Sequence, residues 1–431
     1  MSTTLSEVNA ASFESTLEFA QHLDAMDPFA DLRGQFEIPR TESGGESVYL
    51  CGNSLGLMPR KTRELVAEEL DDWGRLGVEG HLESRRPWYS YHELFRDTGA
   101  RLVGARPGEV VMMNSLTVNL HLLMVSFYRP EGSRRKILIE DGAFPSDTYA
   151  VKTHLRARGV DPDEALVTCA PRDGEETLRI EDVEARIEAL GDELALVMFG
   201  GVHFRTGQVH DMQRITRAAH ANGAMAGFDL AHAAGNVVLE LHDWDVDFAC
   251  WCSYKYLNSG PGALAGAYVH DRHGQDLDVP RFAGWWGNDP GTRFQMQMIP
   301  EFVPQPGAAG WQLSNPPILA AAPLLASLEL FDRAGLPELA TKSRVLTGYL
   351  EFMLRESMPE TCRVITPSAT SERGCQLSVH VTDHPRRRFE ALARNGIICD
   401  FREPDVIRLA PTPLYNSFTD VHAAARVIAD S

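Results

Sequence analysis

The feature that most constrains this chain is a regular alternation of short apolar runs with amphipathic segments between residues 136 and 269. Segments such as IEDVEARIEAL and DMQRITRAAHANG repeat apolar residues at helical spacing, and the second ends at a glycine, as helices commonly do. Strands that alternate with helices predict βαβ units, and therefore an α/β fold with a mostly parallel sheet. The predicted strands are 136–140, 164–169, 194–199, 223–229, 247–252 and 263–269.

The pattern changes near residue 316, where two prolines precede a long helical stretch. After about residue 335 the sequence is typical of a smaller α+β unit. A chain of 431 residues exceeds the usual size of a single core, so two domains are expected. We predict an N-terminal segment (1–48) that packs on the small domain, a large domain (49–320) and a small C-terminal domain (321–431).

The composition argues against several classes of protein. Lys and Arg total 41 against 60 Asp and Glu, and a net charge of −19 disfavours binding to nucleic-acid phosphates or anionic lipid. The N-terminus lacks the basic start and apolar core of a signal peptide, and the longest apolar run, ILAAAPLLASLELF, is too short to cross a bilayer. Seven scattered cysteines without a C-x-x-C pair are typical of reduced thiols. We therefore expect a cytoplasmic protein without nucleic-acid or membrane partners.

Two polar residues follow predicted strands directly. Asp229 ends the run GAMAGFD, and Lys255 lies in WCSYKY, just after the next run. Ligands of parallel sheets bind at the carboxyl ends of strands, and pyridoxal phosphate needs both an amine for its aldehyde and a carboxylate for its ring nitrogen. Desolvation and nearby positive charge can lower the pKa of a lysine and make it a nucleophile. On these two residues alone, however, a surface lysine and an aspartate that caps a helix are the simpler interpretation.

Longer stretches of the sequence help to decide between a cofactor site and this simpler interpretation. They include YLCGNSLGLMP (49–59), GHLESRRPW (80–88), NSLTVNLHLL (114–123), FPSD (144–147), GVHFRTGQ (201–208), GFDLAHAAGN (227–236), the run 241–267, GWWG (284–287), SNPP (314–317) and RLAPTPLYNSF (408–418). In these stretches, and in their order, the sequence resembles the kynureninase family of fold-type I pyridoxal phosphate enzymes. Several matches of this length are far more specific than a three-residue pattern.

The resemblance implies hydrolysis of the Cβ–Cγ bond of L-kynurenine or 3-hydroxy-L-kynurenine. The products would be anthranilate or 3-hydroxyanthranilate and L-alanine, in tryptophan catabolism or NAD biosynthesis. It implies that Lys255 binds pyridoxal 5′-phosphate covalently and that Tyr254 relays protons, while Asp229 pairs with the ring nitrogen. The implied cofactor-binding residues are Leu116, Thr117, Phe144, Pro145, Ser146, Asp147, Asp229, His232, Tyr254, Lys255, Trp285 and Asn315.

The same resemblance extends to the substrate and to the assembly. Arg408 matches the arginine that binds the substrate's α-carboxylate, a task that suits a planar guanidinium. His81, Ser314 and Asn315 match positions that line the aryl pocket. Because Trp285 and Asn315 would reach the cofactor of a neighbouring subunit, a homodimer with shared active sites is implied. Gly200 departs from the family, in which a small hydroxyl residue can stand near the phosphate.

Other interpretations remain at this point. GNSLG (52–56) fits the G-x-S-x-G motif of a serine hydrolase that uses Ser54, although it lies early in the chain. A cysteine desulfurase of the same fold would need a reactive thiol, for which Cys362 and Cys375 are candidates, and an aminotransferase or a regulator without activity would also bind the cofactor. We expect neither a metal site in DWDVD (243–247) nor a dinucleotide site in GPGALA (260–265). His220 and the histidines near 270 are predicted to be solvated.

Overall fold

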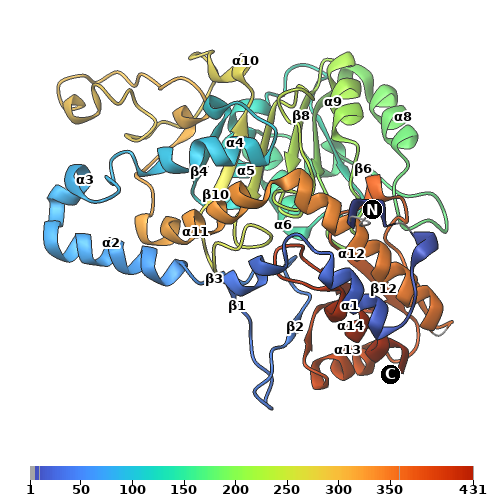
Figure 1. The fold of residues 1–431 in the computed structure, drawn as a ribbon. Helices are drawn as coiled ribbons and strands as arrows, with labels where there is room; N and C mark the ends of the chain where they lie inside the picture. The colour runs from blue at the N-terminus through green and yellow to red at the C-terminus, as the bar shows by residue number, and fades with distance from the viewer. Residues whose placement is uncertain (1–4, 9, 359, 431) are drawn as a thin grey trace.

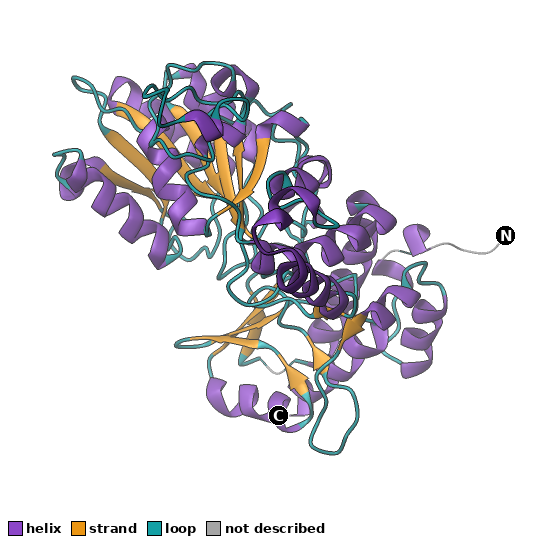
Figure 2. Cartoon of the chain, turned by 90° about the vertical axis from the view of Figure 1, so that its left-hand side faces the viewer, coloured by secondary structure: helices purple, strands orange, loops and turns teal. Residues whose placement is uncertain are grey.

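The structure, a computed structural model, describes residues 5–8, 10–358 and 360–430, and two sheets of different size organise it (Figures 1 and 2). The larger sheet has the strand order β4-β10-β9-β8-β7-β5-β6. Strands β5 to β9 are parallel, whereas β10 is antiparallel to both of its neighbours. All six predicted strands are present, and β4 is additional. The bounds are β4 (Val110–Met113), β5 (Lys136–Glu140), β6 (Leu166–Cys169), β7 (Leu194–Gly200), β8 (Met225–Asp229), β9 (Phe248–Cys252) and β10 (Ala265–Val269).

Helices cover both faces of this sheet. Successive strand residues point to opposite faces, so along β7 Val197 and Phe199 join one buried cluster while Leu196 and Met198 join another. The first cluster includes residues of α8 (Ile180–Leu190), α9 (Met212–Ala221) and α11 (Ile318–Ala334). The second includes residues of α5 (Leu116–Phe127) and α6 (Pro145–Ala157). This arrangement confirms the predicted α/β fold.

The smaller sheet is antiparallel, with the strand order β11-β12-β15-β14. Its strands are β11 (Cys362–Val364), β12 (Leu377–Val381), β14 (Asp400–Arg402) and β15 (Val406–Leu409), and its helices are α12 (Leu336–Ser357), α13 (Pro385–Arg394) and α14 (Phe418–Asp430). Leu23 of α1 (Leu17–Ala25) is buried in the same core, whereas Leu32 and Phe36 of the N-terminal segment belong to the core of the large sheet. Residues 1–4 and 9 of that segment lie outside the described residues. Leu339 in α12 still belongs to the core of the large sheet, and the boundary at residue 320 stays a prediction.

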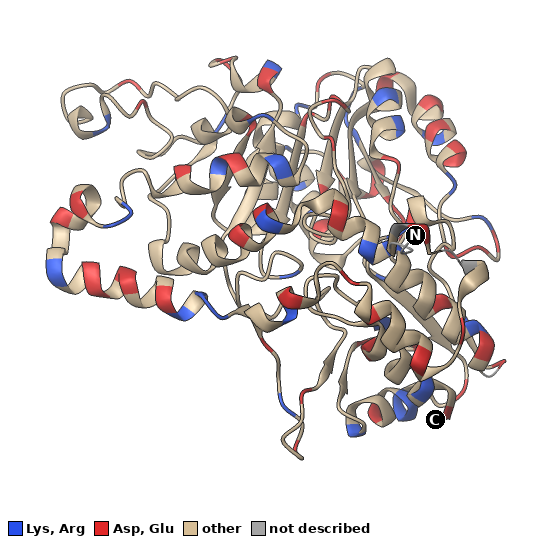
Figure 3. Ribbon diagram, in the orientation of Figure 1, with Lys and Arg blue, Asp and Glu red and all other residues tan. Residues whose placement is uncertain are grey.

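An arm made of α2 (Thr62–Leu76) and α3 (Gly80–Glu83) extends away from both sheets, at the left of Figure 1. Leu65 of α2 packs on α11, and the ribbon in Figure 3 is coloured for both acidic and basic residues along this helix. Leu70 and Trp73, which the sequence places on one apolar face with Val66, are 47% and 59% exposed. Val66 packs on α11, but the rest of this apolar face, Leu70 and Trp73, is left about half exposed in the single chain.

The remaining elements are short connections. They are β1 (Phe36–Glu37), β2 (Val48–Tyr49), β3 (Met58–Pro59), β13 (Ile397–Ile398), α4 (Arg96–Leu102), α7 (Pro162–Ala165) and α10 (Asp271–Gly274). A search of the described helices finds none with the length and apolarity that a bilayer span requires.

Asp247 directly precedes β9. It lies at the edge of the large sheet opposite the one that holds the carboxyl ends of the parallel strands. Its Oδ2 accepts hydrogen bonds from His220 Nε2 at 2.8 Å and from the Ala226 N–H at 2.7 Å, and its Oδ1 lies 2.7 Å from His273 Nε2 and 2.5 Å from Arg272 Nη2. The prediction that His220 and the histidines near 270 are solvated was wrong. His220 and His273 are half-buried because their imidazoles bond to the buried Asp247 carboxylate, and the half-buried His270 imidazole accepts the Arg272 N–H.

Candidate active site

A cavity of about 230 Å³ lies at the edge of the large sheet where its parallel strands end. Glu140, Gly200 and Asp229 are the last residues of β5, β7 and β8, and Lys255 follows the end of β9. The carboxyl ends of neighbouring parallel strands meet at one edge, so the fold brings these residues together. The lining residues are Asn53, Ser54, Leu116, Thr117, Glu140, Phe144, Ser146, Asp147, Gly200, Val202, Phe204, Asp229, Ala231, His232, Tyr254, Lys255 and Arg402.

The Lys255 amine is held beside an imidazole and an aromatic ring. Its Nζ lies 3.0 Å from His232 Nε2 and 5.9 Å from the centre of the Phe144 ring. Burial and the charge of Lys255 hold the pKa of His232 well below its usual value, so the imidazole is neutral. His232 Nε2 therefore accepts a hydrogen bond from the amine, and the amine is oriented into the cavity.

Three carboxyl groups share the part of the cavity nearest the strands. Asp147 and Asp229 are hydrogen-bonded to each other, and Asp229 Oδ1 also accepts the Ala231 N–H at 2.6 Å. Burial raises the pKa of both aspartates, and the charge of Asp229 raises that of Asp147 further, so Asp147 keeps its proton and donates a hydrogen bond to Asp229. Burial also raises the pKa of Glu140 to about 7. This end of the cavity is therefore suited to a cationic ring nitrogen.

Two helices begin at the cavity wall. Leu116 and Thr117 start α5, and Phe144 precedes α6, whose first turn holds Ser146 and Asp147. No side chain caps α5, so its first N–H groups are available to an anion, and the helix dipole favours one. In α6 Pro145 has no N–H and the Asp147 N–H donates to the Phe144 carbonyl at 2.9 Å, so this helix offers the N–H of Ser146. Thr117 Oγ1 and Ser146 Oγ lie 3.2 Å apart and add two hydroxyl donors.

Tyr254 and Pro145 complete this group of predicted residues. Tyr254 lines the cavity, and burial together with the neighbouring Cys252 raises the pKa of its phenol, which therefore stays protonated. Pro145 is the first residue of α6, a position at which its missing N–H costs no hydrogen bond. At Gly200 the backbone N–H donates to Glu140 Oε1 at 3.0 Å, and a Cβ built there would lie 3.0 Å from the same oxygen. A hydroxyl residue at this position would therefore press against Glu140.

Arg408 is close to the cavity but does not line it. Its side chain is fully buried, with Nη2 2.6 Å from Asp400 Oδ2 and Nη1 donating to the Phe204 carbonyl at 2.7 Å. Arg402 is the guanidinium that lines the cavity. Ser54 Oγ donates to Asp400 and accepts from Arg408, so it is part of an ion-pair network and has no catalytic histidine as its partner in the described residues.

The remaining predicted residues lie around a second cavity, of about 200 Å³, between the arm and the start of α11. It is lined by Glu69, Trp73, His81, Trp88, Trp286, Asn315, Ile318 and Leu319, and it shares no residue with the first cavity. Trp285 stacks edge-on against Trp286 at 4.8 Å, and Ser314 and Asn315 are exposed. Within one chain, therefore, His81, Trp285, Ser314 and Asn315 do not meet Lys255.

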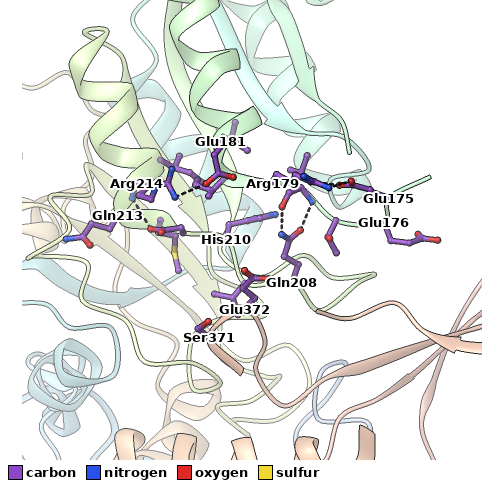
Figure 4. A pocket seen from close by; sticks show the side chains of 18 of the residues that line it. Glu175, Glu176, Arg179, Glu181, Gln208, His210, Gln213, Arg214, Ser371 and Glu372 are labelled. Carbon is purple, nitrogen blue, oxygen red and sulfur yellow. Dashed lines mark hydrogen bonds and ion pairs between the residues drawn. The ribbon is translucent and has the colours of Figure 1, made fainter. Parts of the chain in front are cut away.

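A third and larger cavity, of about 910 Å³, lies between α8, α9 and the small domain (Figure 4). Its arginines are neutralised, because Arg179 pairs with Glu175 at 2.5 Å, Arg214 with Glu184 at 2.5 Å and Arg363 with Glu176. None of the predicted site residues lines it. The candidate thiols Cys362 and Cys375 are also buried away from the Lys255 cavity, and burial raises the pKa of Cys375 to about 12. A thiol in that state is a poor nucleophile.

Sequence reasoning missed four lining residues that carry polar or aromatic side chains: Asn53, Glu140, Phe204 and Arg402. Glu140 carried a signal, because it ends a predicted strand as Asp229 does. Arg402 carried none, since its position depends on how the small domain packs on the large one.

Comparisons with known proteins agree with this geometry. The family model described as the kynureninase C-terminal domain matches residues 339–428. A kynureninase of Myxococcus xanthus is 56% identical over 417 residues, covering 96% of this chain and 97% of the relative. A kynureninase of Koribacter versatilis is 52% identical over 413 residues, with 96% of this chain and 97% of the relative covered.

Solved structures share the fold at low sequence identity. A complex of the cystine C-S lyase C-DES with cysteine persulfide has a TM-score of 0.75 at 18% identity, covering 89% of this chain and 97% of that chain. An apo cysteine desulfurase from Thermococcus onnurineus has a TM-score of 0.73 at 18% identity, covering 93% and 97%. At this identity the likeness concerns the fold alone.

Proposed function

The chain belongs to the kynureninase family, and from this we propose that it hydrolyses the Cβ–Cγ bond of L-kynurenine or 3-hydroxy-L-kynurenine with the help of pyridoxal 5′-phosphate. The products are anthranilate or 3-hydroxyanthranilate and L-alanine, within tryptophan catabolism, in the cytoplasm. The observation that carries the proposal is the single cavity in which Lys255, Asp229 and the starts of two helices face one another.

The residues of this cavity fit the cofactor at each of its functional groups. The Lys255 amine suits the aldehyde, the Asp229 carboxyl group suits the ring nitrogen, and the uncapped N–H groups of α5 suit the phosphate. Phe144 provides an aromatic face, and the buried Nδ1 of His232 has no partner among the described residues, which leaves it free for the cofactor or the substrate. When bound, the cofactor supplies an electron sink for the substrate's α-carbon.

The chain's own groups then hold and move protons. Asp147 keeps its proton and donates a hydrogen bond to Asp229, which would hold the Asp229 carboxyl group where the ring nitrogen would bind. Lys255 Nζ, oriented by His232, would hold the cofactor's aldehyde, and as a free amine it would move the proton at the substrate's Cα. Tyr254 keeps its phenol proton and relays it on the phosphate side of the cavity. Arg408, with the network around Asp400, provides the positive charge for the substrate's α-carboxylate.

We further propose a homodimer with shared active sites. Large apolar patches are rare on monomers, yet the arm and the segment after β10 expose several large side chains. These are Leu70, Trp73, Val78, Leu82, Phe282 and Phe294, with exposures of 47, 59, 76, 65, 60 and 64%. Trp285, Asn315, His81 and Ser314 lie beside these residues and away from Lys255. A second subunit would cover the apolar face and bring this group to the partner's cofactor.

The activity is tested with the purified protein and both substrates. We expect a yellow protein, a chromophore fixed to Lys255 by borohydride, and equal amounts of L-alanine and the aryl product from at least one kynurenine. The ratio of kcat/KM for the two substrates then defines the preference. A protein that releases sulfide from cysteine and leaves both kynurenines intact would contradict the proposal.

The shared site is tested by mixing two inactive variants, Lys255→Ala and Trp285→Ala. In a mixed dimer one site combines the intact Lys255 of one subunit with the intact Trp285 of the other, so we expect activity to return when subunits exchange. If each site were built from one chain, both sites of the mixed dimer would stay inactive. Mixing each variant with itself is the control, and size-exclusion chromatography reports the dimer.

A further inference from the structure

Three charged side chains gather on one face of the small sheet, at the wall of the Lys255 cavity. Asp400 and Arg402 are two residues apart on β14, so they point to the same face. Arg408 lies directly opposite Asp400 on β15 in the antiparallel register. Side chains opposite one another in neighbouring strands are close enough to interact, and the sheet therefore fixes all three groups together.

Asp400 binds both guanidinium groups at once. Arg402 Nε lies 3.0 Å from Asp400 Oδ1, and Arg408 Nη2 lies 2.6 Å from Asp400 Oδ2. Arg408 is held at the back of the network, where it is fully buried and also bonded to the Phe204 carbonyl and to Ser54 Oγ. Arg402 is at the front, with 36% of its side chain exposed, and its guanidinium lies 5.8 Å from the Phe204 ring at the cavity wall.

The charges of this network do not cancel. Burial alone would raise the pKa of Asp400, but the charge and hydrogen bonds of Arg408 outweigh burial and lower it, so Asp400 is ionised. Two guanidinium groups and one carboxylate leave one positive charge. The guanidinium that reaches the cavity surface is that of Arg402, and one positive charge matches one carboxylate on an α-amino acid.

We propose that Arg402 is a second ligand of the substrate's α-carboxylate, beside Arg408, and that Asp400 is the positioning residue that holds the two guanidinium groups on one side of the cavity. The inference rests on the proposed function for the identity of the substrate. It adds a residue from the part of the small domain that touches the cavity, and it gives the domain interface a direct role in substrate binding.

The kinetic test compares Arg402→Gln with Arg402→Lys and with Arg205→Gln. Arg205 is a matched control, because it is 33% exposed, lies near the same interface and pairs with Glu176 at 2.9 Å. A charge-assisted hydrogen bond is worth a factor of about 10 to 100 in affinity. We therefore expect Arg402→Gln to raise KM by about 10- to 100-fold with little change in kcat, Arg402→Lys to restore part of the loss, and Arg205→Gln to change neither. An unchanged KM in Arg402→Gln would overturn the proposal.

A binding measurement separates recognition of the carboxylate from a structural effect. The absorbance of the bound cofactor is titrated with L-alanine and with ethylamine, which lacks the carboxylate. Arg402→Gln should weaken L-alanine at least about 10-fold and ethylamine less than 2-fold. Equal weakening of both would assign a structural role to Arg402 and contradict the proposal.

This readout does not depend on turnover. If the parent enzyme fails to cleave kynurenines but binds L-alanine through Arg402, the proposed function fails and the carboxylate site stands. If the parent enzyme cleaves kynurenines but Arg402→Gln weakens L-alanine and ethylamine equally, the proposed function stands and the role of Arg402 in carboxylate binding fails.

Discussion

Asp229 and Asp247 occupy opposite ends of the same pair of strands, β8 and β9, and their surroundings differ. Both carboxyl groups are buried, with exposures of 7% and 1%. Asp247 accepts hydrogen bonds from two histidines, an arginine and a backbone N–H. Burial alone would raise its pKa, but the His220 and His273 bonds and the Arg272 charge lower it well below the usual range. At this end of the sheet, the chain itself therefore supplies the hydrogen-bond and ionic partners of the buried carboxylate.

At the carboxyl end of β8, the buried acidic side chains outnumber the cations that could neutralise them. Asp229 is close to Asp147 and Glu140, and burial raises the pKa of all three carboxyl groups. Of the two cations that line the cavity, Lys255 acts on the two aspartates, whereas Arg402 is paired with Asp400. Oxygens of Asp147 and Glu140 are buried with no hydrogen-bond partner among the described residues. A buried polar group without a partner costs about 1 to 3 kcal/mol. The sheet thus uses one end for stability and leaves the other incomplete until a ligand binds.

The largest expected effect comes from Asp229→Asn, which should break function and leave the fold intact. The amide cannot stabilise a protonated ring nitrogen, and the loss of one charge at a preorganised site costs about 100- to 1000-fold in rate. We expect kcat/KM to fall by about that factor, with an altered absorbance of the bound cofactor. The free energy of unfolding of the cofactor-free protein should not fall, because an acid that is costly to bury has been removed. A clear loss of stability would mean that the two ends of the sheet do not differ.

Asp247→Asn makes the opposite change at the opposite end. The variant leaves the buried edges of His220, His273 and Arg272 without their anion, and breaking a buried ion pair typically costs 3–5 kcal/mol. We expect urea denaturation to show a loss of about 3 kcal/mol, while kcat per folded active site stays within about 2-fold of the parent. A large fall in kcat with unchanged stability would reverse the assignment of the two ends.

The contrast between the two ends also explains what could be predicted from the sequence. The βαβ alternation predicts which residues end parallel strands, and therefore that Asp229 and Lys255 meet; local pattern is enough for this. The resemblance to the kynureninases supplies Phe144, Asp147 and the starts of α5 and α6. The Asp247 cluster was missed, because its members come from α9, the loop before β9 and α10, and no period in the sequence relates these segments.

Arg402 and the arm were missed for a related reason. The position of Arg402 depends on how the small sheet meets the large one, and that contact is set by packing between distant segments. The sequence placed Val66, Leu70 and Trp73 on one face of a helix, which is correct, but amphipathicity does not say whether that face meets the chain's own core or a second subunit. Val66 packs against α11, and it is the exposure of Leu70 and Trp73 that favours the second subunit.

The smallest expected effect is on the pH dependence of stability, in which Glu140 and Asp247 should differ in sign. The usual pKa of 4.5 for Glu140 is raised to about 7 in the folded chain, so between these values the folded state binds more protons than the unfolded state. Its contribution to stability is therefore present below the unfolded pKa and is lost as pH rises to about 7. Asp247, whose pKa is lowered, behaves in the opposite sense: its contribution is present above the usual pKa of an aspartate and is lost as pH falls.

Glu140→Gln removes the pH dependence of stability that is due to Glu140 and leaves the one that is due to Asp247. At about 1.4 kcal/mol per pH unit, the variant should match the parent near pH 5 and exceed it by up to about 3 kcal/mol at pH 8. The measurement is urea unfolding of the cofactor-free proteins at both pH values, with the exposed Glu188→Gln as the control that should show no such difference. A variant that is equally stable at pH 8, or less stable, would show that Glu140 has a partner in solution and that the carboxyl end of the sheet is complete without its ligand.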